Sequence, residues 1–100
     1  MTIRISNYSK PTEKRGDLQY YRWRVFIDEP PEQLNKIKSV EYLLHPTFPQ
    51  PVQVCTNPNN KFALETLGWG EFSILVRVNY KDGSKEDSDY LLRLNKGWPQ

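Results

Sequence analysis

The side chains best suited to catalysis or soft-metal binding are scarce in this chain of 100 residues, which has one histidine, His45, and one cysteine, Cys55. A tetrahedral zinc site of His and Cys ligands would need more of them. A Cys–His pair is formally possible, but no third residue suggests itself to orient the imidazole. The sequence therefore predicts no catalytic residue, no metal site and no bound cofactor.

Two other patterns that can indicate chemistry are also weak here. The segment Gly68-Trp69-Gly70 carries a bulky residue and lacks the Lys and Ser/Thr of a phosphate-binding loop. The carboxylates Glu86, Asp87 and Asp89 lie in or beside a turn, where a solvated edge is a better interpretation than an acid–base pair. We therefore expect a binding protein and not an enzyme.

The charge balance gives little indication of a polyanionic partner, because 14 Lys and Arg face 12 Asp and Glu, a net charge of +2. The N-terminal stretch is more basic, and we interpret it as a solvated, mobile arm and not as a phosphate-binding stripe. A nucleic-acid role would need the basic residues on one face, which the sequence does not show. We expect no direct nucleic-acid binding.

Compartment signals are few. No run of about twenty apolar residues could span a bilayer, and the first residues lack the apolar core of a secretory signal. A lone cysteine gives no internal disulfide and suits a reducing compartment. We expect no membrane contact and a cytoplasmic protein, or a nuclear one if the source is eukaryotic.

Two loops combine residues that could form a binding site. The first is Leu44-His45-Pro46-Thr47-Phe48-Pro49, and the second is Leu67-Gly68-Trp69-Gly70-Glu71-Phe72. Glycines let the backbone approach a ligand closely, and a tryptophan at a loop tip must either pack onto the core or line a site. Two interpretations stay open: the rings are end-caps of the core and His45 donates to a loop carbonyl, or they form a pocket.

The elements that would hold these loops are strands, because apolar residues alternate with a period of two. The clearest strand is 71–80, followed by an Asp82-Gly83 turn of type I′ and a return strand over 88–94. Strands are also expected at 2–8, 19–28, 37–45, 52–56 and 61–66, with a short helical candidate at 32–37. We predict an all-β fold, an immunoglobulin-like antiparallel β-sandwich of about seven to eight strands. Residues 1–100 would be one domain, with 95–100 as a tail or linker.

The paired motifs LHPTFP and GWGEF, in this order within a small β-sandwich, resemble the YEATS family. The corresponding family signature is a His-x-Ser/Thr-Phe loop and a Gly-Trp/Tyr-x-x-Phe loop. The resemblance covers residues 18–94 and is nearer to the prokaryotic branch of the family. Two departures are Pro46, at a position that is often polar or acidic in histone readers, and Glu71, which places a charge beside Trp69.

The resemblance implies a reader of acylated lysine, of acetyl or crotonyl type, on a protein or peptide. Thr47 would bond to the acyl amide, Phe48 and Trp69 would be two aromatic walls, and the Trp69 backbone N–H would meet the acyl oxygen. An aromatic residue just before Trp23 also belongs to the pattern, and Tyr21 or its neighbour Tyr20 could supply it. The implied ligand-binding residues are His45, Thr47, Phe48, Gly68, Trp69, Gly70, Phe72 and Tyr21.

The chemistry of such a pocket is coherent, because acylation removes the lysine charge and leaves a flat amide that two rings can sandwich. A free ammonium would lose its hydration in an apolar slot without compensation. The alternative is a protein-interaction module that keeps the sandwich and binds a protein surface or an adjacent domain of a longer protein, for example along Tyr20, Arg22 and Phe26. An open slot between Phe48 and Trp69 would favour the reader.

Overall fold

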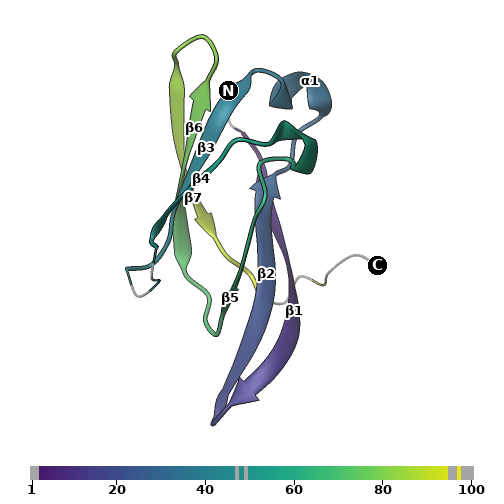
Figure 1. Cartoon of the computed structure of the whole chain (residues 1–100), viewed down its shortest axis with the longest axis vertical. Helices are drawn as coiled ribbons and strands as arrows, with labels where there is room; N and C mark the ends of the chain where they lie inside the picture. The colour runs from purple at the N-terminus through teal and green to yellow at the C-terminus, as the bar shows by residue number, and fades with distance from the viewer. Residues whose placement is uncertain (1–2, 47, 49, 95–96, 98–100) are drawn as a thin grey trace.

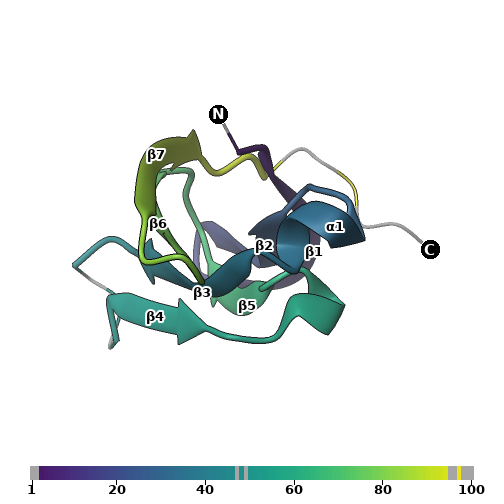
Figure 2. The same ribbon diagram turned by 90° about the horizontal axis from the view of Figure 1, so that it is seen from above.

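The computed structural model describes residues 3–46, 48, 50–94 and 97 as two β-sheets that face one another (Figures 1 and 2). The elements in chain order are β1 (Ile5–Arg15), β2 (Leu18–Ile27), α1 (Pro31–Leu34), β3 (Ile37–Leu43), β4 (Val52–Cys55), η1 (Pro58–Asn60), β5 (Leu64–Gly68), β6 (Ser73–Tyr80) and β7 (Lys85–Leu91). One sheet has the order β1-β2-β5 and the other β4-β3-β6-β7, and every pairing is antiparallel. The predicted all-β sandwich is confirmed.

The core lies between the sheets and follows the predicted alternation. On β2 the side chains of Trp23, Val25 and Ile27 are fully buried. On β6 the same is true of Ile74 and Val78, with Val76 between them. Because side chains of a strand alternate between its two faces, the intervening residues face outward.

The N-terminal stretch is a long strand and not the mobile arm that we expected. β1 pairs with β2 from Ile5 opposite Ile27 to Arg15 opposite Leu18, with one register shift between Pro11 and Lys14. Gly16 has φ 63° at the first central position of the two-residue turn, the pattern of a type II′ hairpin. Pairing with β2 satisfies the backbone hydrogen bonds of β1, whose polar sequence does not indicate a strand. The β1–β2 hairpin extends well beyond the other strands (Figure 1).

The β6–β7 hairpin also differs from the prediction. Only Gly83 has a positive φ, of 92°, so the turn is not type I′, which needs two positive φ angles. The Gly83 N–H donates to the Tyr80 carbonyl at 3.1 Å, and the Tyr80 N–H donates to the Ser84 carbonyl at 2.9 Å. This is the pattern of a three-residue loop that ends in a glycine bulge, and it starts β7 at Lys85 instead of Ser88.

Other boundaries move by a few residues. The strand expected over 61–66 begins at Leu64, because Lys61 and Phe62 adopt φ 61° and 55° after η1. This turn buries the Phe62 ring, and the Phe62 carbonyl accepts a hydrogen bond from the buried Tyr42 hydroxyl at 2.8 Å. The helical candidate shortens to the four residues of α1.

A polar contact joins the two sheets along the seam between β1 and the end of β7. The fully buried Asn7 side chain donates through Nδ2 to the Arg93 carbonyl at 2.7 Å. Its Oδ1 accepts from the Arg93 N–H at 3.2 Å and from the Tyr90 hydroxyl. A buried amide is stable only when it is hydrogen-bonded in this way.

Candidate functional site

Both of the unusual loops lie at the same end of the sandwich, the lower end in Figure 1. One connects β3 to β4 within the four-stranded sheet, and the other carries the chain from β5 in the three-stranded sheet to β6 in the four-stranded sheet. The first loop is closed by the Leu44 N–H, which donates to the Pro51 carbonyl at 2.7 Å, and by the Phe48 N–H, which donates to the His45 carbonyl at 3.0 Å. The topology therefore brings together two segments that are distant in sequence.

A cleft of about 460 Å³ lies between these loops. Six of the eight predicted site residues line it: His45, Phe48, Gly68, Trp69, Gly70 and Phe72. Thr47 lies outside the described residues, so its predicted role stays a prediction. Tyr21 does not line the cleft; it pairs with Gly68 across the β2–β5 ladder, and its neighbour Tyr20 is the tyrosine of the lining.

The inner side of the cleft is aromatic. The rings of Phe48 and Phe72 are 5.4 Å apart between centroids, and each makes an edge contact with the buried Trp23 ring, at 6.4 Å and 6.0 Å. The His45 imidazole lies 6.3 Å from Phe72 in a T-shaped contact. The Leu92 N–H holds the end of the β5–β6 loop by donating to the Phe72 carbonyl at 2.9 Å. Phe48 and Phe72 are thus held by the core.

Trp69 behaves differently from these rings, because it is 58% exposed. It directly follows β5 and lines the cleft with Phe48, yet the described rings of Phe48 and Trp69 make no contact with one another. The tryptophan is therefore not an end-cap of the core. The slot has one wall packed against the sandwich and one wall that extends into solvent.

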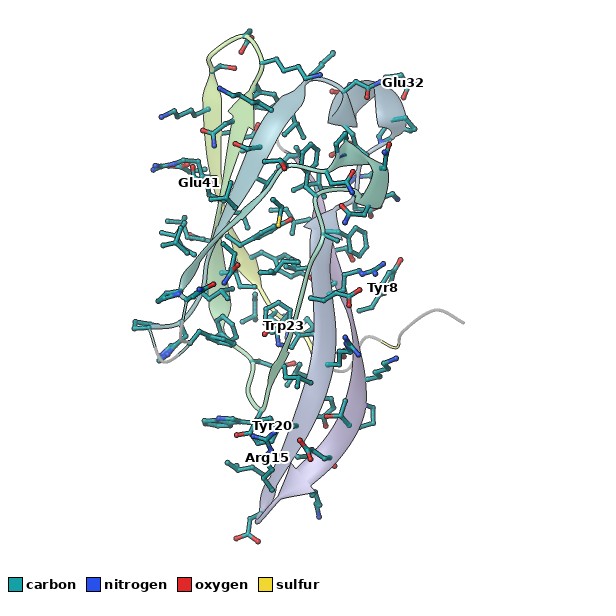
Figure 3. The ribbon with its side chains drawn as sticks, in the orientation of Figure 1. Tyr8, Arg15, Tyr20, Trp23, Glu32 and Glu41 are labelled. Atoms are coloured by element: carbon teal, nitrogen blue, oxygen red, sulfur yellow. The ribbon has the colours of Figure 1, made fainter. Side chains whose placement is uncertain are left out.

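Three lining residues were not predicted as site residues: Tyr20 was only an alternative to Tyr21, and Leu67 and Glu71 were left out. The Glu71 carboxylate accepts a hydrogen bond from the Leu94 N–H at 2.9 Å, which ties the second loop to the end of the chain. Tyr20 lies beside Arg15, whose guanidinium is 4.5 Å from the ring centroid (Figure 3). The alternation of β2 placed Tyr20 on the outer face. Its neighbour Tyr21 pairs with Gly68 at the end of β5, and this register brings Tyr20 to the cleft.

Behind the cleft lies the indole of Trp23, which points from β2 into the space between the sheets (Figure 3). Its Nε1 is buried and is the one described side-chain nitrogen or oxygen that is buried without a hydrogen-bond partner. A methyl group added at Gly68 would lie 3.3 Å from this nitrogen and 3.7 Å from Phe48 Cζ. Any side chain at position 68 would therefore crowd the indole.

The Cys55–His45 pair does not form a catalytic arrangement in this structure. His45 lines the cleft and Cys55 does not; the Cys55 thiol donates to the Ala63 carbonyl at 3.5 Å. Burial raises the pKa of this thiol and so disfavours the reactive thiolate. Within the described part of the chain, no group of three or more His, Cys, Asp or Glu side chains could hold a metal ion.

A larger hollow, of about 710 Å³, lies at the other end of the sandwich beside the β6–β7 hairpin. Its lining includes Lys36, Lys81, Lys85 and Glu86, all of them charged, and one ring, that of Tyr80. It has neither paired rings nor an unpartnered buried donor, so we place the candidate site at the aromatic cleft. No helix among the described residues is long and apolar enough to cross a membrane.

Comparison with known proteins identifies the family of this chain. The profile of the prokaryotic YEATS domain matches residues 21–93. The Protein AF-9 homolog of Eremothecium gossypii is 35% identical over 89 residues, which cover 79% of this chain and 42% of that protein. That of Schizosaccharomyces pombe is 30% identical over 91 residues, covering 84% of this chain and 41% of its own. The chain thus spans about two fifths of these two relatives' length.

Solved structures show the same fold. The Yaf9 YEATS domain described as recognizing an H3K122suc peptide superposes with a TM-score of 0.74 at 24% identity, covering 95% of this chain and 78% of that one. The Yaf9 YEATS domain bound to H3K27ac gives a TM-score of 0.71 with the same identity and coverage. The profile match over most of the chain, together with the 35% identical relative from Eremothecium gossypii, shows that the protein belongs to the prokaryotic YEATS domain family.

Proposed function

We propose that this domain recognises acylated lysine on a protein or peptide and performs no chemistry on it. The observation that carries the proposal is the open cleft with Phe48 on its inner side and the exposed Trp69 beside it. A flat neutral amide fits between two rings, and each ring contributes about 1 kcal/mol beyond the area that it buries. An exposed tryptophan that would be covered by a ligand is also consistent with such a role.

Charge provides the selectivity in this proposal. The inner lining is formed by Phe48 and Phe72, so a free lysine ammonium would exchange water for aromatic and apolar surface. Acylation removes that charge and supplies a carbonyl and an N–H that need partners once they are desolvated. In the family pattern these partners are the Thr47 hydroxyl and the Trp69 backbone N–H, which we carry over to this chain as part of the proposal.

The related proteins support the proposal without deciding the ligand. Yaf9 YEATS domains are described with H3K122suc and H3K27ac peptides, so this fold accommodates acyl groups of different size and charge. The acyl group and the carrier protein of this chain are therefore questions for binding measurements with several acyl forms.

The test is calorimetric titration with one peptide sequence carrying lysine, acetyl-lysine or crotonyl-lysine. We expect binding of the acyl forms and a loss of about tenfold or more in Trp69→Ala, because a stacking wall is removed. Leu91→Ala is the matched control, since Leu91 is also exposed (42%) and does not line the cleft. Equal affinity for lysine and acetyl-lysine would show that the proposal is wrong.

A second candidate function is protein interaction through the four-stranded sheet. The patch suggested by the sequence is not supported, because Phe26 is 5% exposed and packs on Tyr8 with ring centroids 5.0 Å apart. The edge strand β4 instead exposes Val52 (55%) and Val54 (57%) on its outer face. Exposed apolar residues on a sheet edge favour pairing with another chain. Val54→Lys should abolish such pairing and leave acyl-lysine binding intact.

A further inference from the structure

The buried indole N–H of Trp23 has no acceptor, and its position relates it to the cleft. Trp23 is fully buried, and its Nε1 makes no hydrogen bond. A buried donor left without an acceptor lowers the stability of the fold, so its retention needs an explanation. Around the indole lie the rings of Phe48 and Phe72, whose centroids are 6.4 Å and 6.0 Å from that of Trp23, and Gly68.

No described residue accepts a hydrogen bond from this nitrogen. The Phe48 ring, nearly perpendicular to the indole at 85°, offers at most a weak N–H···π contact. An incoming acceptor atom would therefore replace a weak partner with a strong one.

Gly68 lies between this donor and the cleft. It is buried in β5, and its backbone is outside the left-handed region, so a side chain is not excluded by φ. A side chain here would press on the indole, because a Cβ would lie 3.3 Å from Nε1, closer than ordinary van der Waals contact. Gly68 and Phe48 both pack against the Trp23 indole and both line the cleft, so the donor lies directly behind the cleft lining.

We propose that the Trp23 indole N–H is a specificity-determining donor at the inner end of the cleft, and that it selects acyl groups carrying a neutral hydrogen-bond acceptor beyond their first carbonyl. This proposal rests on the proposed acyl-lysine function. The stacked amide lies between Phe48 and Trp69, so only the tail of the acyl group extends toward Trp23. A 3-oxoacyl group, with its second carbonyl two carbons further along, has the required chemistry.

A neutral acceptor suits the cleft better than an anionic one. Glu71 lines the cleft and brings a carboxylate to its rim. This charge disfavours a second carboxylate in the same cleft, and at the inner end such a carboxylate would also lose its hydration beside the rings. An indole N–H can offer one hydrogen bond, which satisfies a ketone oxygen but leaves most of a carboxylate uncompensated.

The test compares two acyl tails of similar shape on one peptide. Acetoacetyl-lysine carries the ketone acceptor, and isovaleryl-lysine replaces that ketone with a CH–CH₃ group. Each is titrated into the wild-type chain and into a chain with Trp23→3-benzothienylalanine, which replaces the indole N–H by sulfur and keeps the ring shape. We expect the wild-type chain to prefer acetoacetyl-lysine by about tenfold, the effect of one buried hydrogen bond. The variant should bind both peptides equally.

A second measurement needs only the wild-type chain. In a ¹H–¹⁵N spectrum the Trp23 indole resonance should move downfield with acetoacetyl-lysine and not with isovaleryl-lysine, because a new hydrogen bond deshields the proton. An acetoacetyl preference that persists in the variant, or no preference together with an unmoved Trp23 resonance, overturns the proposal. Acetyl-lysine binding without that preference leaves the proposed function intact, whereas no binding of any acyl peptide overturns both.

Discussion

Asn7 and Trp23 each bury a polar group in the same sandwich, but they differ in whether that group is hydrogen-bonded. Asn7, at the seam between β1 and the end of β7, makes three hydrogen bonds, to Arg93 and Tyr90. Trp23, at the β2–β5 side, makes none through its Nε1. Both are fully buried, so burial alone does not explain the difference.

The comparison separates two uses of buried polarity. A satisfied buried amide joins two strands and contributes to folding, since removing it would leave several groups without partners. An unsatisfied donor reduces the stability that its ring contributes, and in our proposal a ligand in the adjacent cleft completes it. The Asn7 seam should therefore respond to mutation in stability, and the Trp23 region in binding.

The largest expected effect is at the seam. Asn7→Leu keeps the branching and the number of side-chain heavy atoms and removes the partner of the Arg93 backbone and of the Tyr90 hydroxyl. We expect a loss of about 3 kcal/mol in the free energy of unfolding, measured by urea denaturation. Tyr90→Phe is the graded control and should lose about 1 kcal/mol. If Asn7→Leu unfolded at the wild-type urea concentration, Asn7 would be a space-filling residue only.

A smaller loss is expected at the buried Tyr42 hydroxyl, which donates to the Phe62 carbonyl at 2.8 Å. Tyr42→Phe removes this donor and leaves the carbonyl unsatisfied, so the free energy of unfolding should fall by about 1–2 kcal/mol. Burial raises the pKa of Tyr42 strongly, which agrees with a hydroxyl that stays protonated. An unchanged free energy of unfolding would mean that this hydrogen bond gives no net stabilisation. It would then contradict the view that satisfied buried polar groups stabilise this fold.

Gly68→Ala tests the Trp23 side of the comparison, where we expect an effect on binding and not on stability. The added methyl would lie 3.3 Å from Trp23 Nε1 and 3.7 Å from Phe48 Cζ. We expect stability to change by less than about 1 kcal/mol, because alanine lowers the entropy of the unfolded chain while it crowds the indole. Affinity for acyl peptides should fall about tenfold in calorimetry.

Gly97→Ala is the control for Gly68→Ala, since a Cβ at Gly97 would meet nothing within 4 Å. Wild-type acyl affinity in Gly68→Ala would show that the space beside Trp23 is not used by the ligand. A loss of stability well above 1 kcal/mol would instead show that the glycine serves packing.

The smallest expected effect concerns pH. Burial, together with the hydrogen bond from the Tyr80 hydroxyl to Glu86 at 3.0 Å, raises the pKa of Tyr80 to about 12. A folded-state pKa above the unfolded value of about 10 means stability that is complete below pH 10 and is lost as pH rises toward 12. The loss should be below about 1 kcal/mol, because the group is partly screened by solvent.

Comparing Tyr80→Phe with the wild type between pH 9 and 12 isolates this contribution, since Tyr42 remains in both proteins. A stability difference that stays constant over this range would contradict the assigned pKa of Tyr80. Acyl binding should not follow this titration, because Tyr80 does not line the cleft.

The sequence predicted what depends on local pattern. The buried faces of β2, β3 and β6 followed from alternation, and the two loops were recognised by their aromatic residues and glycines. β1 was misread because Lys10, Pro11 and Lys14 show no alternation, and only pairing with β2 accounts for its length. The β6–β7 turn was misassigned because Asp-Gly suits more than one hairpin loop, and the number of loop residues decides between them.

The sequence predicted those site residues that stand out within one loop, and it missed those that only strand pairing brings to the cleft. His45, Phe48 and Trp69 stand out within their own loops, so their presence in one cleft was expected. Tyr20 enters the lining only through the β2–β5 register, in which its neighbour Tyr21 pairs with Gly68. The unpartnered Trp23 N–H has no sequence signature, because it depends on which residues surround the indole in space.

The two sides of the cleft belong to different sheets, since Trp69 directly follows β5 and Phe48 lies between β3 and β4. The width of the slot is consequently a measure of the separation of the sheets, which the core side chains determine. Substitutions at Val25 or Val76, which touch no ligand, would open or narrow the slot from within. In the proposed reader, drift in the hydrophobic core would therefore change the acyl length that fits, while every residue that lines the cleft stays the same.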